Sequence, residues 1–157
     1  KIFSKLNMKS VFKYNLHNFF YLPSVWWCGV RVKKVDEKKC IVNVKHKWVN
    51  QNPFNSMFWA VQGMAAELCT GVLIMNEISL SQKKFSMLVL NNHANFSKKA
   101  TGIITFECNQ GIEIRDSIKK AIHLNKPQTL WLNSIGKNSN GHIVSSFKFE
   151  WTLKPKI

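Results

Sequence analysis

A long apolar stretch between positions 52 and 78 constrains the fold more than any other part of the sequence. It reads NPFNSMFWAVQGMAAELCTGVLIMNEI, and apolar residues follow Asn55-Ser56, a good N-cap pair, on almost every side of the expected helix. A helix that is apolar all round is a buried helix. At about 1.5 Å per residue it spans roughly 33 Å, the width of a small domain. We therefore expect this helix to run through the middle of the core.

One carboxylate stands in the centre of this expected helix. Glu67 lies four residues after Gly63 and four before Gly71, so the three share one helix face. Glu is rarely fully buried without a partner or a raised pKa, and each mid-helix Gly costs about 1 kcal/mol relative to Ala. Two interpretations stay open. Either a strand or helix packs against the glycines with Glu67 in a structural hydrogen bond, or Glu67 is a catalytic carboxylate beside a substrate groove.

The chain is strongly basic. It has 157 residues and a net charge of +15, from 23 Lys and Arg against 8 Asp and Glu. Its length predicts a single domain over residues 1–157. The charge favours an anionic partner such as nucleic acid, an anionic membrane or a phosphate-bearing ligand. The lysines are scattered, however, and no nucleic-acid-binding motif is present. A codon bias towards Lys and Asn explains much of the charge, and we expect no nucleic-acid partner.

Cysteine and histidine usage argues against a metal site. The four cysteines show neither metal-ligand spacing nor a disulfide framework. We interpret them as reduced, packed thiols, typical of a cytoplasmic protein, and no signal peptide is expected. None of the five histidines pairs with Asp, Glu or Cys at ligand spacing. Residues 57–75 are long enough to cross a membrane, but Gln62, Glu67 and Thr70 interrupt them, so we expect no transmembrane segment.

The rest of the sequence alternates between strand and helix patterns. An amphipathic helix is predicted at about residues 10–21, and its apolar face either packs on the domain or lies on a membrane surface. Strands are predicted at 29–35, 40–48, 85–96, 101–108, 128–135 and from 143 onward, with a short helix at about 113–124. This order indicates an α+β fold, in which an antiparallel sheet of about six strands wraps around the long helix.

Three local motifs resemble a known family. The sequence reads N-P-F-N-S at 52–56, A-A-E-L-C-T-G at 65–71 and F-S-K-K-A-T-G at 96–102. These segments resemble an uncharacterised, thioesterase-like branch of the hotdog-fold superfamily, whose members typically read N-P-F-x-S and A-A-E-x-x-x-G. The resemblance covers about residues 10–154. It implies the hotdog fold of acyl-CoA thioesterases and dehydratases.

The resemblance also implies a division of roles within the site. In hotdog thioesterases, backbone N–H groups at the helix start polarise the thioester carbonyl. An acidic residue on the central helix, often contributed across a dimer, acts as base or nucleophile. Glu67 matches the acid, and Asn52 or Asn55 matches the polar residue of the preceding loop. The amides near residues 57–59 match the oxyanion site. The expected substrate contacts are Ser56, Met57, Phe58, Trp59, Gly63 and Gly71.

The first functional hypothesis is therefore hydrolysis of an acyl-CoA or acyl-carrier thioester, with Glu67 activating water. It needs no cofactor beyond the coenzyme A of the substrate. The resemblance implies a homodimer, or a dimer of dimers, with the groove between protomers. A second hypothesis is a non-catalytic hotdog module that binds acyl-CoA or fatty acyl ligands. Pro53-Phe54-Asn55 favours it, because better-known thioesterases often carry His-Gly-Gly before the helix. A third is a structural or nucleic-acid-associated basic protein.

Overall fold

The computed structural model describes residues 2–156, with side chains from Ser10 onward. Its elements are α1 (Ile2–Tyr21), α2 (Pro23–Trp27), β1 (Arg31–Val35), β2 (Cys40–Lys45), the 3-10 helix η1 (Trp48–Asn50), α3 (Trp59–Ser81), β3 (Phe85–Phe96), β4 (Ile103–Cys108), α4 (Gly111–Leu124), β5 (Gln128–Lys137) and β6 (Ile143–Pro155). The expected α+β fold with six strands and a long helix is confirmed.

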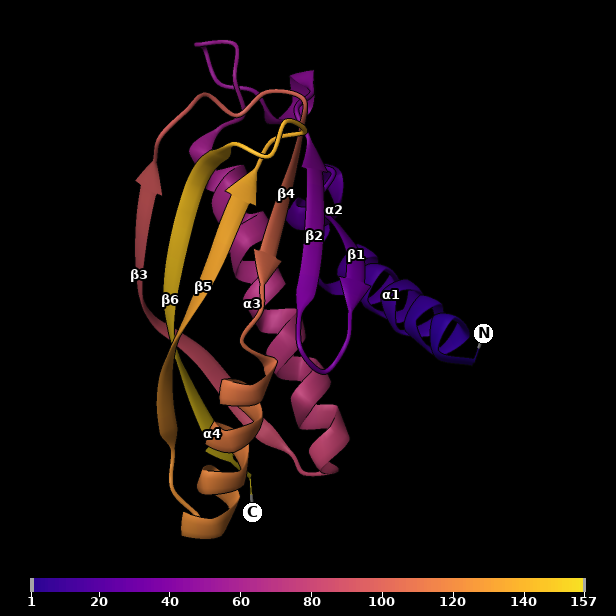
Figure 1. Cartoon of the computed structure of the whole chain (residues 1–157), viewed down its shortest axis with the longest axis vertical. Helices are drawn as coiled ribbons and strands as arrows, with labels where there is room; N and C mark the ends of the chain where they lie inside the picture. The colour runs from indigo at the N-terminus through magenta and orange to yellow at the C-terminus, as the bar shows by residue number, and fades with distance from the viewer. Residues whose placement is uncertain (1, 157) are drawn as a thin grey trace.

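The six strands form one antiparallel sheet in the order β1-β2-β4-β5-β6-β3. The helix α3 runs along one face of this sheet, and α4 covers its lower end (Figure 1). The strands β1 and β2 form the predicted hairpin, and β3 and β1 are the two edges. The sheet thus covers one side of α3, which is the hotdog arrangement.

The alternating pattern of β6 builds the core against α3. Its inward residues Phe147, Phe149, Trp151 and Leu153 are buried, as the period-two pattern predicts, while Lys148 between them is exposed. The ring of Phe147 packs parallel to that of Phe149. Twelve residues of α3 are also buried in this core. Burial of this apolar surface is the main stabilising contribution to the fold.

The two glycines of α3 lie against aromatic rings of β6. A Cβ on Gly63 would lie 3.7 Å from Phe147 Cε1, and a Cβ on Gly71 would lie 3.6 Å from the ring of Trp151. The indole N–H of Trp151 donates to the hydroxyl of Thr70 at 3.0 Å, which fixes this contact. The packing interpretation of the glycines is therefore confirmed, with a strand as the neighbour.

The start of α3 differs from the prediction. The helix begins at Trp59, with Phe58 at the N-cap and no side-chain cap, so the proposed Asn55-Ser56 cap was wrong. The reason is a tight loop held by Asn52. Its Oδ1 accepts hydrogen bonds from the backbone N–H groups of Phe54 and Ser56. The polar residues that suggested a cap therefore stabilise the turn in front of the helix.

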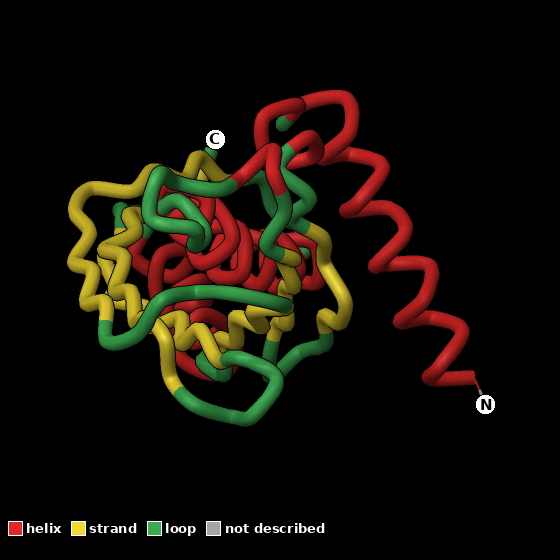
Figure 2. The backbone as a smooth tube through the Cα atoms, turned by 90° about the horizontal axis from the view of Figure 1, so that it is seen from above, coloured by secondary structure: helices red, strands yellow, loops and turns green. Residues whose placement is uncertain are grey.

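The helix α1 lies beside the sheet–helix body (Figure 2). It begins at Ile2, earlier than the predicted start near residue 10. The Asn15 amide donates to the carbonyl of Val32 and accepts from its N–H, at 2.9 and 3.0 Å, so it pairs with the free edge of β1. The short α2 was not predicted, although Pro23 at its start is a known helix-initiation signal.

The helix α3 is long and apolar enough to cross a membrane by length and composition alone. Of its most apolar 18-residue window, 56% is buried inside the fold. A core helix enclosed by a sheet gives the same signal, and the sheet accounts for it here.

Candidate functional site

A pocket of about 500 Å³ lies where the loop before α3 meets the connection between β3 and β4. Predicted site residues that line it are Asn52, Ser56, Met57, Phe58 and Trp59. Gln62 and the segment 96–100 also line the pocket and were not predicted from the sequence. Apart from the F-S-K-K-A motif, nothing in the sequence indicated that the β3–β4 connection faces the helix start. The structure thus brings the expected loop and the first turn of α3 into one cleft.

The backbone amides at the start of α3 are only partly free. The N–H of Met57 donates to Ala100 O at 2.8 Å, and the N–H of Phe58 donates to Asn50 O at 2.9 Å. The prediction that both belong to the oxyanion site was therefore wrong. Among the described residues, the amides of Trp59 and Ala60 have no hydrogen-bond acceptor. The first turn of a helix leaves such donors exposed with partial positive charge.

The loop in front of these donors is held by side-chain hydrogen bonds. The buried Asn50 donates to Cys28 O and Lys45 O and accepts from Lys47 N–H, which ties η1 to the end of β2. Across the pocket, the ammonium of Lys99 donates to Phe54 O at 3.2 Å. These bonds fix the position of the first-turn amides before any ligand binds.

Gln62 places a buried amide in the wall of the pocket. Its Nε2 donates to Met57 O at 3.4 Å, and its Oε1 has no partner among the described residues. A buried acceptor without a partner costs free energy unless water or a ligand satisfies it. Gln62 is therefore a polar group that a ligand or a water molecule in the pocket can contact.

Glu67 lies apart from this pocket, two turns further along α3. It does not line the cleft, and neither do Asn55, Gly63 and Gly71. The carboxylate is half-buried, and burial raises the pKa of Glu67 above its ordinary value. No hydrogen bond or ion pair to its carboxylate is found within residues 10–156. The structural hydrogen bond that the sequence left open is thus not formed, and the carboxylate is available to a further group.

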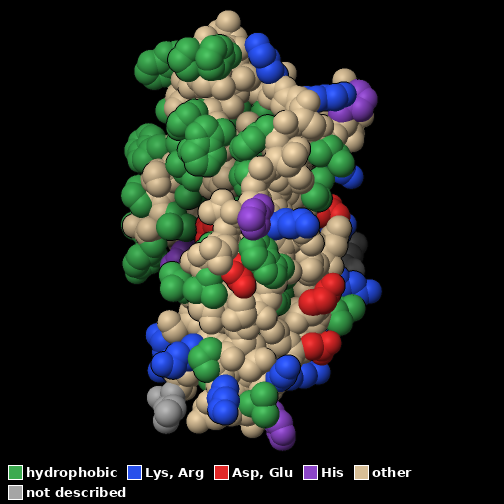
Figure 3. Space-filling model, turned by 90° about the vertical axis from the view of Figure 1, so that its left-hand side faces the viewer, with side chains coloured by type: hydrophobic (Ala, Val, Ile, Leu, Met, Phe, Trp, Pro, Cys, Tyr) green, Lys and Arg blue, Asp and Glu red, His purple; other side chains and the backbone are tan. Residues whose placement is uncertain are grey.

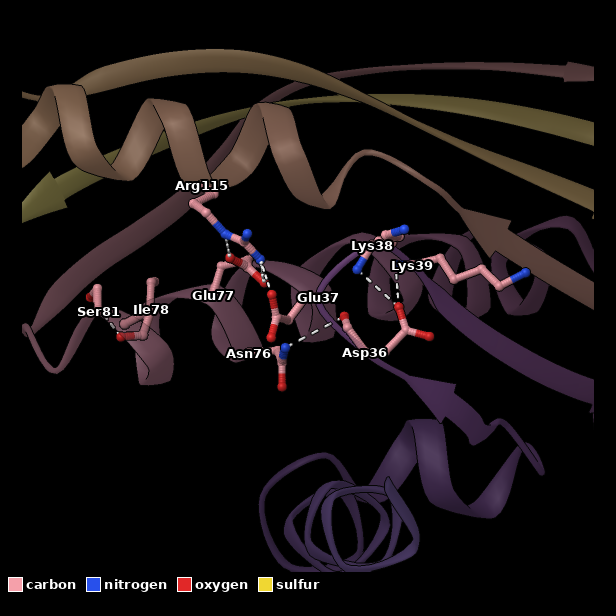
Figure 4. Close-up of polar contacts among 9 residues, drawn as sticks. All are labelled: Asp36, Glu37, Lys38, Lys39, Asn76, Glu77, Ile78, Ser81 and Arg115. Carbon is pink, nitrogen blue, oxygen red and sulfur yellow. Dashed lines mark hydrogen bonds and ion pairs between the residues drawn. The ribbon is translucent and has the colours of Figure 1, made fainter. Parts of the chain in front are cut away.

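A second carboxylate of α3, Glu77, is fully paired (Figure 4). Its side chain is 1% exposed, and Arg115 of α4 donates to it from Nε at 2.8 Å. The same guanidinium reaches Glu37 at 2.8 Å. The neighbouring Glu77 raises the pKa of Arg115. This pair was not predicted from the sequence, because the two residues stand 38 positions apart.

Three of the four cysteines are buried thiols. All four cysteines are free, and Cys40, Cys69 and Cys108 are buried. Burial raises the pKa of the Cys108 thiol to about 12, and Cys69 Sγ donates to Cys40 O at 3.2 Å. Such thiols are unreactive. In the described part of the chain, no cluster of three or more His, Cys, Asp and Glu side chains could hold a metal ion.

Solved structures with this fold include several thioesterases. A Pseudomonas aeruginosa protein of unknown function, described as a probable thioesterase, matches with a TM-score of 0.79 and 19% identity, over 92% of this chain and 95% of that one. A mutant thioesterase from the same species matches at 0.69 and 14% identity, over 93% and 94%. A mutant of a Staphylococcus aureus thioesterase matches at 0.62 and 14%, over 80% and 93%.

These likenesses establish the fold, and the family comes from the sequence. No curated protein matches the chain. The family model described as domain of unknown function DUF4442 matches residues 13–153, which is almost the whole chain. The motifs at 52–56, 65–71 and 96–102 all lie within that match. The chain belongs to the DUF4442 family and has its thioesterase-like hotdog fold.

Proposed function

We propose that this protein hydrolyses acyl thioesters of coenzyme A or of an acyl carrier protein. The observation that carries the proposal is the pocket of about 500 Å³ at the start of α3. Trp59 lines this pocket, and its backbone N–H and that of the adjacent Ala60 have no acceptor among the described residues. Donors fixed in this way stabilise the oxyanion that forms when a thioester carbonyl is attacked. The thioesterase-like fold supports the same reaction class.

In the proposed reaction, water attacks the carbonyl carbon and Glu67 takes its proton. The carbonyl oxygen becomes an oxyanion held by the amides of Trp59 and Ala60. The intermediate then expels the thiolate, which takes up the proton held by Glu67, and the products are a carboxylic acid and a free thiol. A carboxylate whose pKa burial has raised is a better base near neutral pH than an ordinary one.

The spacing of the loop residue and the acid supports this assignment. Asn52 precedes Glu67 by fifteen residues in this chain (67 − 52 = 15). Two structures of one Staphylococcus aureus protein replace a glutamate and a glutamine, which are also fifteen residues apart. In our proposal Asn52 is a positioning residue. Its Oδ1 already accepts hydrogen bonds from two backbone N–H groups of the loop. Asn52 therefore holds the conformation of the loop that leads into Trp59.

The position of Glu67 favours a site shared between two protomers. Eight residues of helix separate it from Trp59, a rise of about 12 Å, which is too far for both to act on one thioester within a protomer. In our proposal, a second copy pairs along the β3 edge and contributes its own Glu67 to the pocket. We therefore propose a homodimer, or a dimer of dimers, with the groove at the interface.

The surface of β3 supports this pairing. It is an edge strand of twelve residues with exposed Leu88, Leu90 and Phe96, next to exposed Phe58 and Trp59 of the helix start. Hydrophobic side chains gather on the upper half of this side of the molecule (Figure 3). Apolar edges of this kind are sites of association. A monomer at micromolar concentration in light scattering would contradict the shared site.

The lysines at the pocket and the free cysteines support proposals for the substrate and for the cellular compartment. Lys98 and Lys99 stand at the pocket, where they can attract the phosphates of coenzyme A. The free, buried cysteines fit a reducing compartment, so we propose a cytoplasmic location. The apolar lining side chains Met57, Phe58 and Phe96 suit the acyl group.

The activity is tested by thiol release from a panel of short, medium, long and aromatic acyl-CoAs. We expect turnover on at least one member. The N–H role is tested by Trp59→Pro, with Trp59→Ala as the matched control. Proline is tolerated at the first helical position, and Phe58 already has φ −59° and ψ 135°, which suit a residue before proline. Only Trp59→Pro removes the donor, so we expect it to lower kcat roughly 100-fold below the Ala variant.

Mixing two inactive variants tests the shared site. Glu67→Gln and Trp59→Pro protomers are unfolded, combined and refolded together. A site built from both protomers restores one intact centre in each mixed dimer, so activity returns to about a quarter of the wild-type level. A site within one protomer restores none.

A non-catalytic acyl-binding module is the second candidate. Two observations favour it: the amides of Met57 and Phe58 are already hydrogen-bonded, and Glu67 lies outside the pocket. Binding of acyl-CoA measured by calorimetry, without thiol release from any member of the panel, would establish the module and overturn the hydrolase.

A further inference from the structure

The outward side of α1 carries an apolar stripe that the fold leaves uncovered. Phe12, Leu16 and Phe20 recur every fourth residue, so they lie along one side of the helix. They are 69%, 45% and 66% exposed. In Figure 2 this helix extends beside the body, so one of its sides is open to solvent.

The opposite side of α1 is what attaches it to the protein. Val11 and Tyr14 pack against the core, Asn15 pairs with the edge of β1, and Asn18 is fully buried. This attachment fixes which side faces outward. The exposed stripe is therefore a constant feature of the fold, and its apolar side chains are additional to those that hold the helix.

The sequence of the α1 segment is basic and contains no acidic residue. The sequence places lysines at positions 1, 5, 9 and 13, and no Asp or Glu occurs before Asp36. Lys13 is exposed beside the stripe. Two amphipathic aromatics, Tyr21 and Trp27, are strongly exposed at the end of the helix and in α2. Such residues favour the boundary between apolar and aqueous surroundings.

We propose that α1 lies on an anionic phospholipid membrane, with Phe12, Leu16 and Phe20 inserted at the headgroup level. An interfacial helix combines an apolar face with flanking lysines, and each basic residue near an anionic leaflet adds attraction. A second copy of the chain suits the stripe less well, because a symmetric contact would bring two segments of basic sequence together. Nucleic acid would use the lysines and leave the apolar side chains exposed. This inference is independent of the proposed hydrolysis.

The test is co-sedimentation of the whole chain with lipid vesicles. We expect it to bind vesicles that contain phosphatidylglycerol, to bind pure phosphatidylcholine vesicles much less, and to be released by salt. Lys13→Glu should weaken binding on the order of tenfold. The matched control is Lys120→Glu, the same charge change on exposed α4, which should change it by less than about twofold because distant charges are screened.

A second pair of variants tests the apolar stripe. Replacing Phe12, Leu16 and Phe20 together by Ser should abolish sedimentation, whereas Ile112→Ser with Leu124→Ser, exposed on α4, should leave it intact. Circular dichroism checks that each variant is folded. The proposal is overturned if the chain does not sediment with anionic vesicles, or if the α1 and α4 variants weaken binding equally. It is also overturned if the Ser variant dissociates a dimer in light scattering, since the stripe would then be a protein interface.

Discussion

The helix α3 carries two carboxylates, Glu67 and Glu77, which lie ten residues apart and differ in burial and in hydrogen-bond partners. Glu77 is almost completely enclosed, and Arg115 holds it with two hydrogen bonds at 2.8 and 3.4 Å. Glu67 is half-buried between Gly63 and Gly71, with no partner within residues 10–156. Burial without compensation raises the pKa of Glu67.

In our proposal, this difference distinguishes a structural acid, Glu77, from a functional one, Glu67. A buried carboxylate with a guanidinium partner joins two elements, here α3 and α4. A carboxylate that is desolvated and left unpaired destabilises the fold, and such groups are found where chemistry requires them. The C-terminal half of α3 is therefore structural, whereas its N-terminal half, with free amides and an unpaired acid, is where we place the reaction.

The largest expected effect is the pH dependence of hydrolysis. A general base must be ionised, so kcat/KM should fall about tenfold per pH unit below the raised pKa of Glu67. The acid limb should therefore lie at higher pH than for an ordinary carboxyl group. Steady-state rates across the acidic range measure this. A profile that stays flat down to the ordinary carboxyl pKa would exclude Glu67 as the base.

The second effect concerns the paired acid. Arg115→Ala leaves Glu77 buried without a counter-charge and should lower the free energy of unfolding by about 2–3 kcal/mol, less than for a fully enclosed pair because Arg115 is 35% exposed. Urea denaturation measures the loss. The control Lys39→Ala breaks a longer pair with Glu107 at 3.8 Å, in which both side chains are partly exposed, and should cost about 0.5 kcal/mol or less. Equal losses of unfolding free energy in the two variants would mean that the Glu77–Arg115 pair is not more important to the fold than the Lys39–Glu107 pair.

The third prediction compares a glycine beside Glu67 with a glycine of the sheet. A Cβ on Gly71 meets Trp151 at an ordinary 3.6 Å, so Gly71→Ala should stabilise the helix by about 0.5–1 kcal/mol. By contrast, a Cβ on Gly136 would lie 2.6 Å from the buried ring of Phe106, and Gly136→Ala should destabilise the fold by about 1–3 kcal/mol. Loss of stability in Gly71→Ala would mean that the Trp151 contact is tighter than the structure indicates.

The smallest expected effect is the change in stability of the fold when Glu67 is replaced. Because its folded pKa is raised, the folded state holds the proton more tightly than the unfolded state. Stability from this group is therefore highest at acidic pH and is lost as pH rises through the folded pKa. Glu67→Gln should raise the melting temperature by a few degrees at pH 8 and less at pH 5. A variant that melts lower at pH 8 would show that the carboxylate has a stabilising partner.

Much of the fold was predictable, because local patterns determine it. The alternation in β6 and the continuous apolar run of α3 correspond to buried faces, and both were recognised from the sequence. The prediction of the start of α3 was wrong because residues typical of a helix cap form a turn instead. Asn55 and Ser56 look like a helix cap, but Asn52 uses this segment for a turn, so the helix begins at Trp59.

The site was predictable only in part, for reasons of distance along the chain. The loop and first turn are local, so Asn52, Phe58 and Trp59 were expected at the pocket. The wall formed by residues 96–100 comes from another part of the chain. The pair of Glu77 with Arg115 likewise depends on how α4 packs against α3, which no local pattern records. The backbone N–H groups of Met57 and Phe58 donate to carbonyls elsewhere in the fold, and no local pattern indicates these bonds either.

The most direct test of the account compares thiol release by wild type, Glu67→Gln and Arg115→Ala on the best thioester, per folded molecule and below the melting temperature of each. We predict that Glu67→Gln loses at least about 100-fold in kcat, as expected for removal of a general base, while Arg115→Ala stays within about threefold of wild type. Turnover that survives in Glu67→Gln and collapses in Arg115→Ala would reverse the assignment of the two carboxylates and contradict the account.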